Sequence, residues 1–403
     1  MRAGERSMTV VKHEQAYSNS QNSASLHQDG AVLPVQVHGI ATAYPPFVMK
    51  QDEVLRKAAA VFGHKPEMMQ RMAKSYGNAG VKQRNSCVPL EWYAAPHGWP
   101  ERMRLFEENA LKLLTEAGQK VLAAAGVSPA DVAATVTVSS TGIVTPSLDS
   151  LLQAPLGLAP GVQRLPVFGL GCAGGVIGLS RAAAMARAQP GRWVLFLCTE
   201  LCGLTFRPAD DSKANIIGTT IFGDGAAAVL LRCAPSSRAD RHGPDAISHG
   251  KDAVLHGSSP VLAHIHAWGE YTWPQTRDIM GWSVEDDGLG VIFSRSIPNL
   301  VRDNMREVTD SFLCEHGLRQ DDINGLIVHP GGEKVLEALE SAYGLSPGGL
   351  IHARDVLAEH GNMSAVTVLA VLEKTLQSGE KGRHLMTALG PGFSVGMCLM
   401  QLV

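Results

Sequence analysis

Apolar positions in the first half of the chain follow two alternating periods. Residues 104–125 carry apolar side chains at helical spacing, which predicts an amphipathic helix that ends at the sequence GVSP. Two apolar, partly β-branched runs, VAATVTVSST from Val132 and RWVLFLCTE from Arg192, predict buried strands. Between them, LPVFGLG predicts a short strand and GCAGGVIGLSRAAAMARA predicts a helix of small residues. FGDGAAAVLLRC from Phe222 then predicts a glycine turn that leads into a strand.

The second half repeats this order of elements. Residues 297–317 predict an amphipathic helix, INGLIVHPGG a strand that ends at His329, and HGNMSAVTVLAVLEKTL a turn into a small-residue helix. RHLMTALGPGFSVGMCLMQLV predicts two strands joined by a Gly-Pro-Gly turn. Corresponding elements of the two halves lie 190 or 191 residues apart. We therefore predict a duplicated α/β protein, with two helix-covered sheets around a shared helical layer.

The same pattern divides the chain into three parts. Residues 1–32 are polar and rich in Ser, Asn and Gln, and we expect a flexible tail. Residues 33–245 form the first half and residues 246–403 the second. The boundary lies within the polar, loop-like stretch from 234 to 252.

Composition and charge narrow the function. The chain has 403 residues, of which 45% are hydrophobic and 18% charged, as in a globular enzyme with a large core. A formal net charge of −3 gives no reason to expect nucleic acid as a partner, and no apolar run is long enough to span a membrane. Seven irregularly spaced cysteines indicate a reduced, cytoplasmic compartment. No metal site is expected, because the pair His264 and His266 supplies too few ligands.

Three residues are expected to meet at the centre of the duplicated unit. Cys172 and Asn362 occupy equivalent positions, each at the start of a small-residue helix, and His329 ends a strand of the second half. Active sites are commonly built at such element ends. Taken singly, each residue has a purely structural interpretation as a packed cysteine, a turn histidine or a helix cap. Their coincidence in one repeat favours a site.

The chemistry of these three residues is complementary. A helix N-terminus and a nearby imidazolium both lower the pKa of a thiol, so His329 would hold Cys172 as a thiolate. Gly171 and Gly174 would give an acyl group and backbone donors room to approach the sulfur. Asn362 can donate an amide N–H to a carbonyl oxygen that becomes negative. Together they predict thioester chemistry followed by an enolate.

The motifs GCAGG, FGDGAAA, HPGG, GNMS and GPGF occur in the order and spacing of type III polyketide synthases, the chalcone-synthase-like enzymes. This chain resembles that family over roughly residues 33–403. The resemblance implies the thiolase fold, a duplicated five-layered αβαβα arrangement, and a homodimer. It implies no cofactor beyond the coenzyme A thioesters that serve as substrates.

The resemblance also implies roles for individual residues. Cys172 matches the nucleophile that carries the growing chain, and His329 and Asn362 match the pair that stabilises the enolate formed from malonyl-CoA. Phe222 matches the family's gating phenylalanine at the foot of the coenzyme A tunnel. The residues expected to meet substrate elsewhere are Cys202, Thr205 and Ser364 in the cavity, and Arg71 and Lys74 at the coenzyme A phosphates.

The sequence departs from the plant members of the family at the cavity. The plant pattern Gly-Phe-Gly-Pro-Gly is ALGPG here, and Val291 stands where plant members have a gatekeeper phenylalanine. Trp282 stands where chalcone-forming members tend to have glycine. An indole there would fill volume that folding for carbon–carbon ring closure needs, whereas closure to a pyrone needs less.

The resulting prediction is an alkylpyrone synthase that extends a fatty acyl-CoA starter with two or three malonyl-CoA units and then lactonises the chain. An alkylresorcinol synthase, which closes the same chain by aldol condensation, is the close alternative. The starter acyl group could also come from a fatty acid synthase instead of from a free acyl-CoA. An enzyme like ketoacyl-carrier-protein synthase III is less favoured, because that family usually has Gln after the His and Pro330 follows His329 here. A non-catalytic thiolase-fold scaffold would have no need of the complete Cys-His-Asn set.

Overall fold

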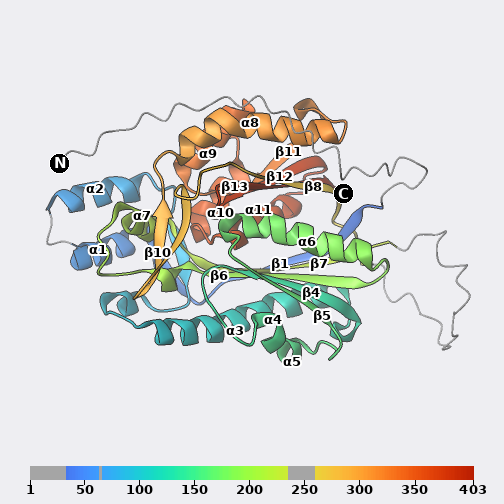
Figure 1. Cartoon of the computed structure of the whole chain (residues 1–403), viewed down its shortest axis with the longest axis horizontal. Helices are drawn as coiled ribbons and strands as arrows, with labels where there is room; N and C mark the ends of the chain where they lie inside the picture. The colour runs from blue at the N-terminus through green and yellow to red at the C-terminus, as the bar shows by residue number, and fades with distance from the viewer. Residues whose placement is uncertain (1–32, 63–65, 235–258) are drawn as a thin grey trace, which may run out of the picture. The chain divides into compact units, whose positions relative to one another are not determined.

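The computed structural model describes residues 33–62, 66–234 and 259–403. Its largest element is a nine-stranded sheet (Figure 1). In order across the sheet the strands are β11 (Gly325–Val328), β12 (Gly382–Gly390), β13 (Ser394–Leu402), β8 (Ala263–Thr272), β1 (Val35–Ala43), β7 (Asp224–Cys233), β6 (Trp193–Leu201), β4 (Val132–Ser139) and β5 (Gln163–Phe168).

The sheet has two halves that correspond to the two halves of the sequence. Strands β1, β7, β6, β4 and β5 form the first half, and β11, β12, β13 and β8 form the second. A short antiparallel pairing joins them, in which Val35–Val37 of β1 face Ala263–Ile265 of β8. The duplication predicted two sheets, and the structure connects the two through this pairing.

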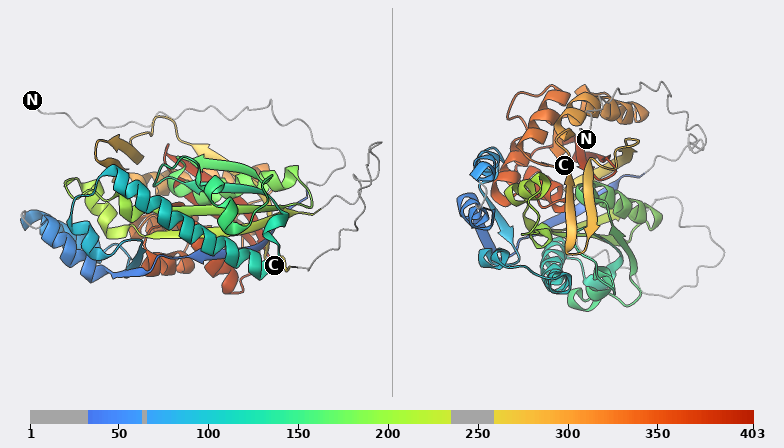
Figure 2. Two further views of the ribbon diagram at one scale, coloured as in Figure 1. Left: turned by 90° about the horizontal axis from the view of Figure 1, so that it is seen from below. Right: turned by 60° about the vertical axis from the view of Figure 1, so that its left-hand side comes forward.

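The remaining elements of the described residues are eleven α-helices, five short 3-10 helices and two two-stranded sheets. The two-stranded sheets are β2 (Phe47–Lys50) with β3 (Gln83–Ser86), and β9 (Met280–Glu285) with β10 (Gly288–Phe293). The helices of the described residues are α1 (Gln51–Phe62), α2 (Pro66–Gly77), α3 (Trp99–Ala125), α4 (Leu148–Leu151), α5 (Gln153–Leu156), α6 (Gly174–Ala188), α7 (Lys213–Ile221), α8 (Ile297–Glu315), α9 (Glu333–Tyr343), α10 (Ile351–His360) and α11 (Ala365–Gln377). The β9–β10 hairpin stands outside the large sheet and contacts α7 (Figure 2).

The helices and the two half-sheets form five layers. Helix α6 contacts β4 and β6 of the first half and β12 and β13 of the second, and α11 lies beside it. Helix α3 covers the outer face of the first half. Helix α8 covers the outer face of the second, where the Phe312 ring packs on Gly269 of β8 (Figure 1). The αβαβα order predicted from the sequence is confirmed.

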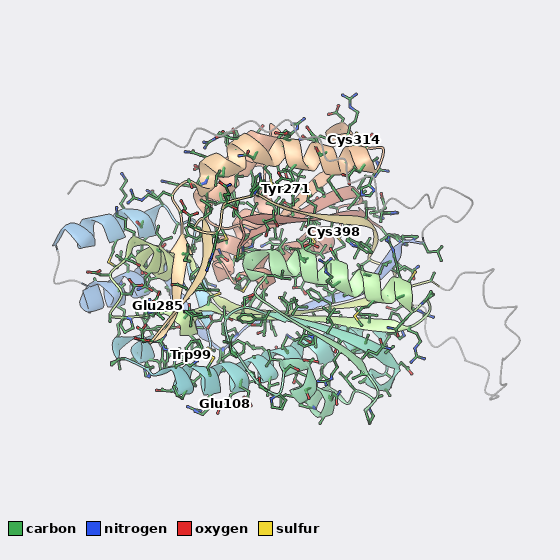
Figure 3. All side chains as sticks on the ribbon, in the orientation of Figure 1. Trp99, Glu108, Tyr271, Glu285, Cys314 and Cys398 are labelled. Atoms are coloured by element: carbon green, nitrogen blue, oxygen red, sulfur yellow. The ribbon has the colours of Figure 1, made fainter. Side chains whose placement is uncertain are left out.

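Two sequence expectations concern residues that the structure does not describe. The predicted tail, 1–32, and the predicted boundary between 245 and 246 both lie outside the described residues. Within the described part, no helix combines the length and the apolar character that crossing a bilayer requires. The cysteines form no disulfide, and they range from exposed Cys314 on α8 to buried Cys398 on β13 (Figure 3).

Helices α6 and α11 approach each other closely at their N-terminal ends. A Cβ atom on Gly175 would lie 2.2 Å from the carbonyl oxygen of Ala365, and one on Gly174 would lie 2.8 Å from Val138 Cγ1. These distances are shorter than atomic contacts allow, so only glycine permits this packing. The sequence interpretation of Gly174 as room for an acyl group is therefore wrong, because protein atoms fill that space.

Replacing Gly175 by Ala should destabilise the protein without touching a reactive group. The added methyl would collide with backbone rather than with a movable side chain, and such overpacking costs roughly 1–3 kcal/mol. Gly161→Ala is the matched control, because a Cβ atom there has no neighbour within 4 Å. Chemical denaturation should give a lower free energy of unfolding for Gly175→Ala only. Equal values for the two variants would contradict the close approach.

Candidate active site

Cys172 lies in a single 3-10 turn, η3 (Gly171–Ala173), that leads directly into α6. Gly171 has a φ of +48°, and a Cβ atom there would lie 2.6 Å from Pro391 Cδ of the Gly-Pro-Gly turn. Gly171 N also donates a hydrogen bond to Ser140 Oγ at 2.9 Å. The glycine before the cysteine thus lets the loop turn and lets Pro391 pack against it, so that Cys172 is held at the start of the helix.

His329 and Asn362 are positioned by main-chain hydrogen bonds. His329 follows β11 and its N–H donates to Thr387 O at 2.9 Å, while its buried ring has no hydrogen-bond partner on either nitrogen among the described residues. Asn362 N donates to Ile221 O at 2.7 Å at the end of α7. These bonds fix the backbone from which both side chains project.

A chain of contacts connects the three predicted residues. The η3 turn that carries Cys172 packs against the N-terminal end of α11, which Ser364 directly precedes. Ser364 N donates to Asn362 Oδ1 at 2.8 Å, and Asn362 Nδ2 donates to Gly331 O at 3.3 Å. Gly331 N in turn donates to His329 O at 3.1 Å. The structure thus brings Cys172, Asn362 and the His329 loop together at the N-terminal ends of α6 and α11.

Burial disfavours the charged form of both reactive groups. It raises the pKa of the Cys172 thiol to about 12, and it lowers the pKa of the His329 imidazole to about 3. The imidazolium that holds a thiolate stays a prediction from the sequence, and burial acts against both of its charges. The physical reason is desolvation, because no described hydrogen bond to either His329 nitrogen offsets the cost of a buried charge.

Helix α7 separates two cavities. Its residues Asn215, Gly218 and Thr219, with Phe222 directly after it, line a cavity of about 80 Å³. Residues of its other faces, including Ile217 and Ile221, line a cavity of about 1080 Å³. With 3.6 residues per turn, the helix presents the residues of the smaller cavity on one side and those of the larger cavity on the other.

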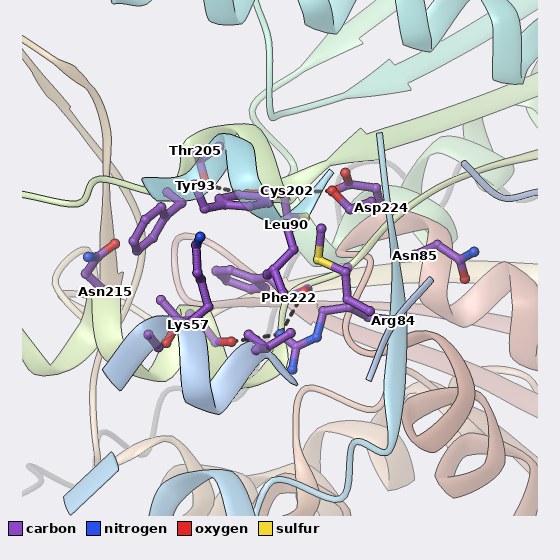
Figure 4. Close-up of a pocket in the computed structure, with 18 of the residues that line it drawn as sticks. Lys57, Arg84, Asn85, Leu90, Tyr93, Cys202, Thr205, Asn215, Phe222 and Asp224 are labelled. Atoms are coloured by element: carbon purple, nitrogen blue, oxygen red, sulfur yellow. Dashed lines mark hydrogen bonds between the residues drawn. The ribbon is translucent and has the colours of Figure 1, made fainter. Parts of the chain in front are cut away.

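The smaller cavity is largely apolar (Figure 4). It contains four of the predicted substrate-binding residues, namely Phe222, Val291, Cys202 and Thr205. Its lining also includes Met49 of β2, Val54, Lys57 and Ala58 of α1, and Leu90 and Tyr93 of the η1 turn (Leu90–Ala94). Trp282 lies beside this cavity rather than in its lining. Its ring centroid is 6.2 Å from that of Phe222, and it pairs with Val291 across the β9–β10 hairpin.

The larger cavity is bordered by four described cations and by the carboxyl groups of Asp211 and Glu333, and it reaches Gly331, whose carbonyl accepts from Asn362. Its four described cations are Lys74, Lys213, Arg295 and Lys334, and among the described residues none of them is in an ion pair. Lys74 thus lines the larger cavity, and its contact with the coenzyme A phosphates stays a prediction. Arg71 is on α2, but its side chain is outside the described part of the chain. In the described residues no cluster of His, Cys, Asp and Glu could hold a metal ion.

Family models match both halves of the chain. The model for the N-terminal domain of chalcone and stilbene synthases matches residues 34–235, and the model for the C-terminal domain matches residues 265–403. The chain belongs to this family, the type III polyketide synthases. The resemblance inferred from the motifs is therefore confirmed.

Relatives of this type III polyketide synthase cover nearly its whole length. A putative chalcone synthase of Bacillus subtilis is 38% identical over 89% of this chain and 96% of its own. A 1,3,6,8-tetrahydroxynaphthalene synthase of Streptomyces peucetius is 34% identical over 91% and 92%. The alpha-pyrone synthesis polyketide synthase-like Pks18 of Mycobacterium tuberculosis is 28% identical over 91% of each chain.

The fold agrees with that of solved family members. The crystal structure of PKS-I from the brown alga Ectocarpus siliculosus has a TM-score of 0.82 and 25% sequence identity, and the match covers 93% of this chain and all of that one. The five layers of this type III polyketide synthase are thus the thiolase fold that the resemblance implied.

Sequence reasoning missed Glu200, a buried carboxyl group at the end of β6. Its Oε2 accepts hydrogen bonds from Ser140 N at 3.0 Å and Thr141 Oγ1 at 2.7 Å, and its Oε1 from Ser364 Oγ at 3.5 Å. Burial raises the pKa of Glu200 to about 7 despite these donors. The available signal was one acidic residue in the otherwise apolar run RWVLFLCTEL.

Arg84 is a second residue that the sequence did not indicate. Its buried guanidinium donates to the carbonyl oxygens of Thr219 and Thr220 at 2.8 Å and of Phe222 at 3.1 Å. These are the carbonyl groups that the C-terminal end of α7 leaves without a helical partner. Arg84 thereby fixes the end of α7 and the backbone of Phe222 in this type III polyketide synthase.

Proposed function

We propose that this enzyme condenses a fatty acyl-CoA starter with two or three malonyl-CoA units and closes the product to an alkylpyrone. The observation that carries the proposal is the division of the site by α7. A cation-lined entrance suits the phosphates of coenzyme A, and an apolar cavity beyond Phe222 suits an alkyl chain. A homodimer and a cytoplasmic location, as the resemblance and the cysteine content imply, belong to the same proposal.

Loading begins at Cys172. The thiol sulfur attacks the carbonyl carbon of the starter thioester, the carbon–sulfur bond to coenzyme A breaks, and the acyl group remains on Cys172. The start of α6 directs N–H groups toward the sulfur, which favours developing negative charge. The alkyl chain then extends past Cys202 and Phe222 toward α1, where apolar side chains exclude water.

Extension uses His329 and Asn362. When malonyl-CoA loses carbon dioxide, the electron pair of the broken bond forms an enolate whose oxygen needs hydrogen-bond donors. A neutral imidazole can supply one N–H and the Asn362 amide another, and the neutral state that burial gives His329 suits this role. The enolate carbon then attacks the Cys172 thioester, so that a carbon–carbon bond forms and the thiol is released.

Closure to a pyrone is supported by Trp282 and by the relatives. The indole packs beside Phe222 and Val291 and narrows the region where a chain would fold for carbon–carbon ring closure. Attack of an enol oxygen on the thioester needs less width and also frees Cys172. The name of the mycobacterial relative, alpha-pyrone synthesis polyketide synthase-like, points to the same product class.

A second candidate function follows from the 34% identity with the tetrahydroxynaphthalene synthase. Under this alternative the product is a naphthalene, as the name of that relative states. The two functions differ in their starter requirement, because the alkylpyrone proposal needs a fatty acyl-CoA in the incubation. An incubation of the enzyme with malonyl-CoA, with and without dodecanoyl-CoA, read by product mass, separates them.

Cys172→Ala should abolish extension, because no acyl-enzyme can form. The measurement is the amount of triketide and tetraketide product by mass spectrometry after incubation with dodecanoyl-CoA and malonyl-CoA. Cys314→Ala, at an exposed position on α8, is the control and should retain full activity. Residual tetraketide from Cys172→Ala would refute the assignment of Cys172 as the nucleophile.

Trp282→Gly should move the product ratio from alkylpyrones toward alkylresorcinols. Removing the indole leaves space beside Phe222 in which the tetraketide can fold for aldol closure. Ultraviolet spectra and product masses report the ratio. Trp282→Phe keeps an aromatic ring in place and should leave pyrones as the main product. A wild-type enzyme that makes mainly resorcinols, or an unchanged ratio in Trp282→Gly, would count against the argument from width.

Ala58→Phe should shorten the starters that the enzyme accepts. Ala58 is buried and lines the apolar cavity on α1, so a phenyl ring there displaces the far end of a long chain. Excluding two methylenes at about 0.8 kcal/mol each should lower kcat/KM for dodecanoyl-CoA roughly tenfold relative to hexanoyl-CoA. Ala60→Phe is the matched control, since Ala60 lies on the exposed face of the same helix. An unchanged chain-length preference in Ala58→Phe would show that the chain runs elsewhere.

A further inference from the structure

The Gly-Pro-Gly turn between β12 and β13, residues 390–392, packs directly on the η3 turn that carries Cys172. A Cβ atom on Gly390 would lie 2.6 Å from Ala173 Cβ, on one side of the cysteine in the sequence. On the other side, a Cβ atom on Gly171 would lie 2.6 Å from Pro391 Cδ. Because the Gly-Pro-Gly turn contacts η3 both before and after Cys172, a displacement of this turn changes the room beside the sulfur.

Thr276 holds this turn from the loop between β8 and β9, residues 273–279. The N–H of Phe393 donates a hydrogen bond to Thr276 Oγ1. The single Thr276 hydroxyl proton is shared between Gly392 O at 2.8 Å and Trp273 O at 2.6 Å. Trp273 N in turn donates to Phe393 O at 2.9 Å. One hydroxyl thus bonds both polar groups of the peptide between Gly392 and Phe393, directly before β13 begins.

The loop adopts an unfavourable backbone conformation to reach this position. Gln275, directly before Thr276, has a φ of +57°, which residues with a side chain rarely adopt. The Trp273 ring stacks on the buried Phe393 ring, with centroids 5.3 Å apart. Strained backbone persists only where the surrounding contacts hold it, and it is concentrated at functional segments. We interpret the shape of this loop as a means of placing the Thr276 hydroxyl at the turn.

The same loop leads to Trp282, so it connects two positions at which this sequence departs from the plant members. Ile279 N donates to Thr276 O at 3.1 Å, and β9 begins at the next residue. Gly281 lies against the Gly-Pro-Gly turn, since a Cβ atom there would be 4.0 Å from Pro391 Cβ. Thr276 therefore ties the altered ALGPG turn to the strand that carries the indole.

We propose that Thr276 is a positioning residue that holds the Gly-Pro-Gly turn against η3 and thereby keeps the space beside Cys172 too narrow for aldol closure. The inference rests on the proposed function, in which a tetraketide on Cys172 closes to a pyrone. Thr276 acts through the turn and touches no reacting atom. Without its hydroxyl, Phe393 N and Gly392 O lose this partner, and the turn is free to move away from η3.

The two closures place different demands on this space. In lactonisation an enol oxygen attacks the thioester carbon, the carbon–sulfur bond breaks, and the enol proton goes to the Cys172 sulfur. In the aldol route a chain carbon attacks a ketone carbon, whose oxygen leaves as water. Water then hydrolyses the thioester, and the freed acid loses carbon dioxide. The aldol route therefore needs room to fold and access for water, and a turn packed closely on η3 restricts both.

The experiment compares the wild-type enzyme with Thr276→Val, Thr276→Ser and Thr375→Val. Valine keeps the branched shape and removes the hydroxyl, whereas serine keeps the hydroxyl. Thr375→Val on α11 is the matched control, because it removes a buried hydroxyl that donates to Val371 O, at 2.8 Å, within its own helix. Each protein is incubated with dodecanoyl-CoA and malonyl-CoA. Mass spectrometry gives the ratio of alkylresorcinol to alkylpyrone, and released coenzyme A gives the total rate.

Thr276→Val should raise the ratio of resorcinol to pyrone about fivefold, which corresponds to ~1 kcal/mol for one hydrogen bond. Its rate of coenzyme A release should stay close to that of the wild type, because the residues that load and extend the chain are unchanged. Thr276→Ser and Thr375→Val should keep the wild-type ratio. An unchanged ratio in Thr276→Val would overturn the proposal. An equal shift in Thr276→Ser or Thr375→Val would also overturn it, since the Thr276 hydroxyl would then not be the cause.

A second measurement separates failure of this inference from failure of the proposed function. Alkylation of Cys172 by iodoacetamide, read by peptide mass spectrometry, needs no substrate, and exposed Cys314 reports the intrinsic reagent rate. Local opening of the turn should make Cys172 react about fivefold faster in Thr276→Val than in the wild type or Thr276→Ser. If this difference is found in an enzyme that makes neither product, the Thr276 contact is supported and the proposed function is contradicted. Equal alkylation rates in all variants would contradict the Thr276 contact itself.

Discussion

The close contact between the N-terminal ends of α6 and α11 is the constraint on which the site depends. The carbonyl oxygen of Ala365 occupies the place where Gly175 would carry a side chain, so the two central helices meet with almost no intervening atoms. Cys172 precedes one helix and Ser364 precedes the other, so this approach brings the two positions to the same end of the central layer. The two half-sheets on either side hold the helices in place, and the short pairing of β1 with β8 joins those half-sheets. The reactive centre is thus a property of the central layer as a whole.

The same burial that brings these groups together sets their charge states. A thiol, an imidazole and a carboxyl group share a space from which water is largely excluded, and desolvation moves the pKa of each toward its neutral form. A thiolate, imidazolium or carboxylate in the resting enzyme would carry the desolvation cost of a buried charge. Neutral groups avoid it, and charge then develops only when a substrate supplies a carbonyl group to receive it.

The sequence was sufficient for the residues whose motifs are local and for the order of elements. Repeated spacing predicted Cys172, His329 and Asn362 at element ends and two helix-covered sheets around a shared helical layer, and the family resemblance implied the five layers. The role of Gly174 was misjudged, because the sequence alone does not distinguish a glycine needed for close packing from a glycine needed for substrate access. Glu200 and Arg84 could not be predicted, because their importance comes from partners such as Ser364, 164 residues away, and Phe222, 138 residues away. Contacts between residues so far apart in the sequence form only in the completed fold, so no local sequence pattern reveals them.

Helix α7 has one further consequence. Its nine residues border the larger cavity on some faces and the smaller, apolar cavity on another, with Arg84 holding its final turn. Volume gained on one side by a shift of this helix is lost on the other. Under the proposed function, starter length and affinity for coenzyme A would therefore be mechanically coupled. Divergence toward longer starters would then proceed through α1, whose residues line only the smaller cavity, and leave the shared partition unchanged.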